Sequence, residues 1–127
     1  MATTSKTGTH ANLTIGLKRA YEAAEAHDGL RILVERLWPR GVSKLAARID
    51  HWVKDVAPTA ALRQWYGHEP ARWPEFQQRY RAQLDGNPDA VAALRRLLEQ
   101  GPVTFVFAAS DVERNSAVLL REYLLER

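Results

Sequence analysis

The fold of this 127-residue chain is decided by the stretch VTFVFAA, residues 103 to 109. Its apolar run is nearly continuous and rich in β-branched and aromatic residues, a pattern typical of a strand buried on both faces of a sheet. Strand patterns alternate with helical patterns in the rest of the chain. The sequence therefore predicts a single α/β domain: a small, open, mostly parallel or mixed four-stranded sheet flanked by helices.

Two further strands are expected upstream of this stretch. Alternating apolar residues predict one over residues 13 to 21, and a β-branched, apolar run predicts another over residues 31 to 38. The polar stretch between them, residues 22 to 29, has eight residues, too few for a helical crossover between neighbouring parallel strands. The second strand is therefore antiparallel to the first or not adjacent to it. Residues 49 to 58 are expected to form a strand, with a distorted helix as the alternative.

Capping residues mark the expected helices. Ser43 caps a short helical turn, and Thr59 caps a helix that ends at Gly67. A second long helix begins near Pro70 and carries one apolar stripe. A third has Asn87 as its cap.

Composition narrows the class of protein. With 46% hydrophobic and 26% charged residues, the chain is typical of a globular domain. It contains no cysteine, which excludes disulfides, thiolate nucleophiles and cysteine-ligated metals. Residues 1 to 12 are expected to be a disordered tail, and residues 13 to 127 one domain.

Location and partners are constrained only weakly. No apolar run approaches the roughly 20 residues that span a bilayer, and no signal peptide is evident, so we expect a cytoplasmic protein with no membrane partner. The net charge of +3 and an isoelectric point near 9.5 modestly favour anionic partners. The sequence leaves the oligomeric state open.

The sequence motifs of several common cofactor-binding and catalytic sites are absent from the chain. The chain contains no P-loop, no G-x-G-x-x-G turn and no G-x-S-x-G elbow, so no nucleotide or dinucleotide cofactor is expected. His51 and His68 fit no metal-ligand spacing, and no metal site is expected.

Two loops that follow strands are the candidate sites, because ligands of open α/β sheets collect at the carboxyl ends of the strands. The first loop carries Arg36, Arg40 and Lys44, whose charged donors suit phosphate or carboxylate, with Trp38 as a possible wall of a ligand pocket. In the structural alternative, the two arginines pair with neighbouring acids, namely Glu35, Asp50 or Asp55.

The second loop begins at Ser110. Ser110 and Glu113 form a capping box that is expected to start the last helix, whose free amides suit an anion. Asp111 and Asn115 are not needed for a cap, and both are candidates for orienting a polar group of a ligand. Asp111 would itself repel an anion.

Several strings make the chain similar to a known family. They are RILVERLWPRG followed by Lys44, the spaced set Asp50, Trp52 and Lys54, the pairs Ala57-Pro58 and Arg72-Trp73, the segment from Leu62 to Trp65, and the closing FAASD with Asn115 and Ala117. From about Ile15 to Leu124 the chain resembles the YeaO-like branch of the domain-of-unknown-function family 488 (DUF488).

The resemblance implies a compact α/β domain in which the two loops form one site, and it implies no particular reaction. More distant relatives carry a Cys-His-Arg element near the position of Asn115-Ser116-Ala117. Close relatives usually have Asn-His-Ala there, so Ser116 weakens any case for a catalytic histidine. A covalent thiolate mechanism is impossible without cysteine.

Three functions remain open. The first is binding of an anionic small molecule, with or without an enzymatic reaction on it. The second is binding or processing of nucleic acid, and the third is a protein-interaction domain whose loops are only structural.

Overall fold

A four-stranded sheet lies at the centre of the structure, a computed structural model that describes residues 14 to 126. The strand order is β1-β4-β2-β3, and every pairing is parallel. The strands are β1 (Ile15–Arg19), β2 (Leu30–Leu33), β3 (His51–Trp52) and β4 (Val103–Phe107). The predicted α/β fold with a four-stranded sheet is confirmed. The tail expected over residues 1 to 12 lies outside the described residues, as does Leu13.

The buried strand β4 explains how β1 and β2 can be joined by a short connection. β4 pairs with β1 on one side and with β2 on the other, so the first two strands are parallel but not adjacent. This is the second of the two arrangements that the sequence allowed. All five residues of β4 are buried, as a central strand requires.

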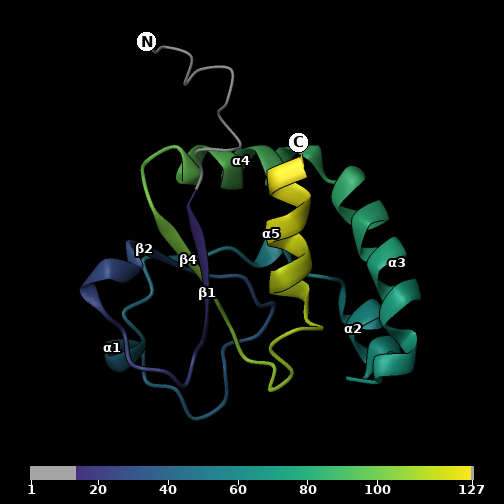
Figure 1. Cartoon of the computed structure of the whole chain (residues 1–127), viewed down its shortest axis with the longest axis horizontal. Helices are drawn as coiled ribbons and strands as arrows, with labels where there is room; N and C mark the ends of the chain where they lie inside the picture. The colour runs from purple at the N-terminus through teal and green to yellow at the C-terminus, as the bar shows by residue number, and fades with distance from the viewer. Residues whose placement is uncertain (1–13, 127) are drawn as a thin grey trace.

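Five α-helices and three short 3-10 helices complete the described fold. They are α1 (Lys44–Ala47), α2 (Ala60–Tyr66), α3 (Trp73–Asp85), α4 (Pro88–Leu98), α5 (Ser116–Glu126), η3 (Ala26–Asp28), η4 (Lys54–Val56) and η5 (Pro70–Arg72). Figure 1 shows α3 and α5 on one side of the sheet and α1 on the other. None of the described helices is long and apolar enough to span a membrane.

The two faces of the sheet are covered differently. Ile32 and Phe105 belong to the main core, which also contains the apolar stripes of α3, α4 and α5. Their neighbours Leu33 and Val106 point to the opposite face, because successive side chains of a strand alternate. There they pack against the loop that joins β2 to β3, including Trp38. The sheet thus separates a helical layer from a layer made mostly of loop.

Three predicted caps are confirmed. Ser43 Oγ accepts a hydrogen bond from Ala46 N at 3.0 Å, and Thr59 Oγ1 accepts one from Leu62 N at 3.2 Å. Gly67 ends α2 in the left-handed conformation, with φ at 53°. Asn87 is different: its side chain donates to the carbonyl of Asp55 and does not cap α4.

Strand β2 ends at Leu33, earlier than the expected end at residue 38. Beyond Val34 the backbone leaves the ladder because side chains take over its hydrogen bonds. The Glu35 carboxylate accepts from Ala108 N at 2.9 Å, and the Trp52 indole donates to the Glu35 carbonyl at 2.7 Å. Residues 49 to 58 contain both expected alternatives in shortened form, the two-residue strand β3 and the turn η4.

The last helix begins at Ser116, so the capping box predicted at Ser110 is wrong. Asn115 Oδ1 accepts the hydrogen bond from Val118 N at 3.0 Å and caps the helix instead. The physical reason lies in the loop, where Asp111 holds the backbone N–H groups of Glu113 and Arg114 in a bend. The cap of α5 therefore lies five residues further along the chain than predicted.

Candidate functional site

A cavity of about 600 Å³ opens where three neighbouring strands end. Arg19 closes β1, Glu35 follows β2, and Ala108 follows β4, and all three residues line the cavity. The segment after β4 leads to helix α5 on one face of the sheet, and the segment after β2 crosses the other face. Neighbouring parallel strands whose continuations diverge in this way leave a crevice, which is the usual ligand site of open α/β sheets.

The structure brings most of the predicted site residues to this cavity. Five of the seven line it: Arg36, Trp38, Arg40, Ser110 and Asn115. Lys44 does not, because it belongs to α1 and lines a separate cleft. Asp111 lies in the second loop but is not among the residues that line the cavity. The two loops therefore face one hollow, without Lys44 and Asp111.

Arg36 is held by backbone carbonyls. Its Nε donates to Pro58 O at 3.0 Å and its Nη2 to Ala57 O at 2.9 Å. The pairing with a neighbouring acid, which was the structural alternative, is absent among the described residues. Nη1 has no partner there either, so the half-buried guanidinium is fixed in place and still has a donor to offer.

Arg19 is fixed in the same way from the other side of the cavity. Its Nε donates to Ala109 O at 2.9 Å and its Nη2 to Ala108 O at 3.2 Å. The guanidinium carbon lies 4.9 Å from the centre of the Tyr21 ring, a cation–π contact. The residue thereby ties the end of β1 to the loop after β4.

Two other arginines of the lining are exposed and make no direct polar contact with the described residues. The side chains of Arg40 and Arg63 form no hydrogen bond or salt bridge with any residue between 14 and 126. Arg114 also lines the cavity, but its Nε is paired with Asp111 Oδ2 at 2.9 Å. Arg40 and Arg63 are therefore the cations with most freedom to meet a ligand.

Glu35 is the only carboxylate in the described lining of the cavity. Burial raises the pKa of this carboxyl group, and the hydrogen bond from Ala108 N together with the nearby Arg63 and His68 opposes the rise. The group links the two loops directly, because it follows β2 and accepts from the residue that follows β4.

The polar groups of the second loop hold the loop itself. The Asp111 carboxylate accepts from Glu113 N at 3.0 Å and from Arg114 N at 3.1 Å, and these bonds with the Arg114 side chain lower the pKa of Asp111. Asn115 is buried, and its Nδ2 donates to Asp111 O at 2.9 Å. Ser110 is exposed and lines the cavity.

Aromatic side chains form part of the wall. The Trp38 indole N–H donates to Val42 O at 2.6 Å, and its ring meets Trp52 edge-on with centroids 5.4 Å apart. Tyr66 reaches the second loop, where its hydroxyl donates to Arg114 O at 2.9 Å. Burial, followed by the charge of Asp111, raises the pKa of Tyr66, so its phenol stays protonated.

Sequence reasoning missed Arg19, Arg63 and Arg114 as lining residues. Arg19 ends a strand, and a firm prediction that this strand is parallel to β4 would have placed it at the same edge. Arg114 lies within the second loop, between the predicted site residues Asp111 and Asn115. Arg63 comes from helix α2, and no signal in the sequence places it opposite the two loops.

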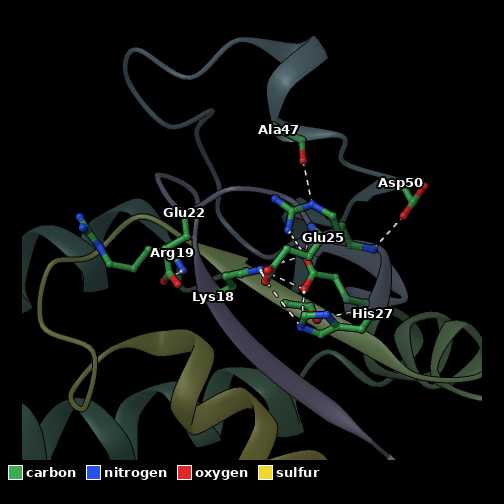
Figure 2. Close-up of polar contacts among 10 residues, drawn as sticks. Lys18, Arg19, Glu22, Glu25, His27, Ala47 and Asp50 are labelled. Atoms are coloured by element: carbon green, nitrogen blue, oxygen red, sulfur yellow. Dashed lines mark hydrogen bonds and ion pairs between the residues drawn. The ribbon is translucent and has the colours of Figure 1, made fainter.

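One cluster of potential metal ligands lies elsewhere. Glu25, His27 and Asp28 have ligand atoms within 4.8 Å of one another. The Lys18 ammonium already forms ion pairs with Glu25 at 2.6 Å and Asp28 at 3.1 Å (Figure 2). A metal ion would have to displace this cation, so the cluster fits an internal ion network better than a metal site.

Comparison with known proteins places the chain among relatives of similar length. Uncharacterized protein Rv3073c of Mycobacterium tuberculosis is 42% identical over 110 residues, 87% of this chain and 92% of that protein. Uncharacterized protein YeaO of Escherichia coli is 34% identical over 112 residues, 88% of this chain and 97% of that protein. No solved structure matches significantly.

The match to a family pattern covers every described residue. The pattern described as "Inactive DUF488-N3 subclade" matches residues 14 to 127, which contain the central sheet and both loops of the cavity. The sequence strings that pointed to this family thus agree with an independent match and with the relative YeaO. This chain belongs to the DUF488 family, as a YeaO-like member.

Proposed function

We propose that the protein binds an anionic small molecule, carrying a phosphate or carboxylate group, in the cavity at the strand ends. One observation carries the proposal: five arginines line the cavity with a single carboxylate among the described lining residues. The arginines are Arg19, Arg36, Arg40, Arg63 and Arg114. So many like charges around one hollow repel one another, and an anion would relieve that repulsion.

The arginines divide into two roles. Arg19 and Arg36 are anchored to backbone carbonyls, so their guanidinium groups are pre-organised and lose little freedom when a ligand binds. Arg40 and Arg63 form no hydrogen bond or salt bridge with the described residues and can close over the ligand. Each charge-assisted hydrogen bond contributes about 1.5 to 3 kcal/mol.

Binding without covalent catalysis fits the residues present. The chain has no cysteine, and the phenol of Tyr66 is engaged with a carbonyl and protonated. The family pattern that matches is itself described as inactive. A receptor or carrier of the anion therefore accounts for the cavity better than an enzyme acting through a nucleophile.

Thermal unfolding measured with a panel of anions tests the proposal. The panel contains inorganic phosphate, pyrophosphate, nucleoside monophosphates, dicarboxylates and short oligonucleotides, each at two salt concentrations. A ligand at 100 times its Kd stabilises by about 2.7 kcal/mol, a rise of several degrees in Tm for a domain of this size.

Three variants assign the effect to the cavity. We expect Arg40→Ala and Arg63→Ala to remove most of the ligand-induced rise in Tm. Arg96→Ala is the matched control, because Arg96 is exposed on α4 and does not line the cavity. The proposal is wrong if no small anion raises Tm, or if Arg96→Ala lowers the rise as much as the cavity variants do.

Oligonucleotides separate the small-molecule proposal from nucleic-acid binding. Binding along a phosphate backbone releases counterions and weakens steeply with salt. Stabilisation by oligonucleotides alone, lost at the higher salt concentration, would replace the proposal with the nucleic-acid function.

A further inference from the structure

A second cleft lies at the opposite ends of the strands. Its volume is about 840 Å³, and it is lined by Gly29, which precedes β2, and by Asp50, which precedes β3. The first cavity lies at the carboxyl ends of the parallel strands, and this second cleft lies at their amino ends. Figure 2 shows the Arg19 side chain leading away from Lys18 and Glu25.

A buried guanidinium with an unused donor lies at this cleft. Arg31 lines it and is only 3% exposed. Its Nε donates to Ala47 O at 2.8 Å and its Nη1 to Asp28 Oδ2 at 2.7 Å (Figure 2). Its Nη2 is the only buried side-chain nitrogen or oxygen in the described part of the chain that lacks a hydrogen-bond partner.

An unsatisfied buried donor calls for an explanation. Leaving such a group unpaired lowers the stability of the fold, and the loss is greater for a charged group. Folded proteins seldom carry that cost, and an ion or water that binds from solution is a common way to remove it. Arg31 therefore points to an acceptor that comes from outside the chain.

Two further cations line the same cleft. Lys44 is the first residue of helix α1 and Arg48 directly follows the helix, and both are exposed. Neither side chain forms a salt bridge or hydrogen bond with the residues that the structure describes. Lys44 is also the basic residue of the first loop that the anion cavity leaves out.

The two acids of the cleft are already engaged. Glu25 forms an ion pair with Lys18 at 2.6 Å, and Asp50 Oδ2 accepts the backbone N–H of Arg31 at 2.8 Å. Lys18 and Arg31 offset the charges of Glu25 and Asp28, and Lys44 with Arg48 outnumber the remaining carboxylate, Asp50. The balance leaves this cleft attractive to an anion and not to a metal cation.

We propose that this cleft is a second site for a small oxyanion, phosphate or carboxylate, separate from the cavity at the carboxyl ends. Arg31 forms its floor and supplies Nη2, while Lys44 and Arg48 close over the anion from the solvent side. The site does not depend on the function proposed for the first cavity.

Titration followed by NMR tests the site directly. The probes are inorganic phosphate and acetate, with sodium chloride at equal ionic strength as the reference. We expect the Arg31 Nε–Hε signal and the backbone amide of Arg48 to shift saturably with at least one of the two oxyanions. Saturation with phosphate alone, or with acetate alone, identifies which oxyanion the cleft takes.

Variants distinguish the two sites from each other. The double variant Lys44→Ala/Arg48→Ala changes only exposed side chains, so it should fold. We expect it to lower the affinity for the oxyanion by at least about tenfold. Arg31→Lys keeps a positive charge beside Asp28 but removes Nη2, and it should weaken binding as well. Arg40→Ala should leave the Arg31 signal and its titration unchanged.

Several results would overturn the site. They are the absence of a saturable shift, an equal shift with sodium chloride, and a titration that is unchanged in the double variant. In each case an internal water would satisfy Nη2 instead. If Arg31→Lys fails to fold, the double variant alone decides.

Discussion

Asp28 is a carboxylate inside the protein, with 5% of its surface exposed. Burial alone would raise its pKa, but hydrogen bonds from Glu25 N, the Lys18 ammonium and the Arg31 guanidinium outweigh burial and lower the pKa to about 2. The Asp28 carbonyl also accepts from the Thr104 hydroxyl at 2.8 Å. A single residue therefore joins β1, β2 and β4 beneath the second cleft.

Replacing Asp28 by asparagine should destabilise the fold strongly. Asp28→Asn leaves two cations without their shared carboxylate, and loss of one partner of a buried pair costs about 3 to 5 kcal/mol. The measurement is the free energy of unfolding in urea at pH 7. Glu25→Gln, at an exposed partner of Lys18, is the matched control and should cost clearly less. Equal losses in the two variants would contradict the central role of Asp28.

The same carboxylate predicts how stability depends on pH. Its pKa falls from 3.8 in the ordinary state to about 2 in the folded protein. Between these values the unfolded chain binds more protons, so stability rises with pH there. The stabilisation by Asp28 is complete above pH 3.8 and is lost as the pH falls through 2. Unfolding curves of Asp28→Asn over this range should show a weaker pH dependence than those of the wild type.

At the scale of elements, the unit β4-loop-α5 shapes one wall of the first cavity. Asp111 and Asn115 satisfy the backbone of the loop and of the first turn of α5, so the loop keeps its form without a ligand. Ser110, at the exposed bend before them, makes no hydrogen bond within the described residues. The capping function has moved five residues along the chain from the position that the S-x-x-E pattern indicated.

Substitutions in this loop should show that Asn115 stabilises the fold and that Ser110 does not. Asn115→Ala removes the helix cap and the bond to Asp111, and should lower the free energy of unfolding by about 1 to 2 kcal/mol. Ser110→Ala should stay within about 0.5 kcal/mol of the wild type. Urea unfolding of both variants provides the measurement. A larger loss of unfolding free energy in Ser110→Ala would indicate that Ser110 caps the helix, as the sequence pattern predicts.

At the scale of the whole molecule, the helical layer and the loop layer pack on opposite faces of the same sheet. Trp38 and Trp52 pack on the loop-covered face, whereas Trp65 and Trp73 pack against the helical core. Because β2 and β4 contribute side chains to both layers, neither layer can keep its packing once the sheet opens. The two sides should therefore unfold together.

Tryptophan fluorescence can test this coupling from both sides. The variant Trp38→Phe/Trp52→Phe reports on the helical side, and Trp65→Phe/Trp73→Phe reports on the loop side. Within each variant we expect the fluorescence midpoint in urea to coincide with the midpoint from far-UV circular dichroism. A fluorescence transition that precedes the circular dichroism in one variant would show that its layer melts alone.

Much of this architecture was predictable from local patterns. The continuous apolar run of β4, the stripe of α3 and the caps Ser43 and Thr59 are all properties of neighbouring residues, and the structure confirms them. The short segment between the first two strands also excluded adjacent parallel pairing correctly. The two loops that line the cavity were identified because each directly follows a strand.

Other features depend on residues far apart in the sequence. The end of β2 at Leu33 depends on Glu35 meeting Ala108, and the start of α5 depends on the bend held by Asp111. The grouping of Arg63 with the loop residues depends on where α2 packs. Whether a side chain or a neighbouring strand accepts a backbone hydrogen bond depends on which of them lies close in the fold. Local periodicity does not encode that distance.

The sequence by itself determined the α/β class, the buried central strand, the absence of thiol chemistry and the basic character of the loops, because composition and short-range periodicity suffice for each. Only the tertiary structure decided which cations share a hollow. Parallel pairing places Arg19 and Arg36 together at the carboxyl ends of the strands. Lys44 lies with the buried Arg31 at the amino ends. Charges act through space, so the grouping of these cations depends on which strands pair with each other.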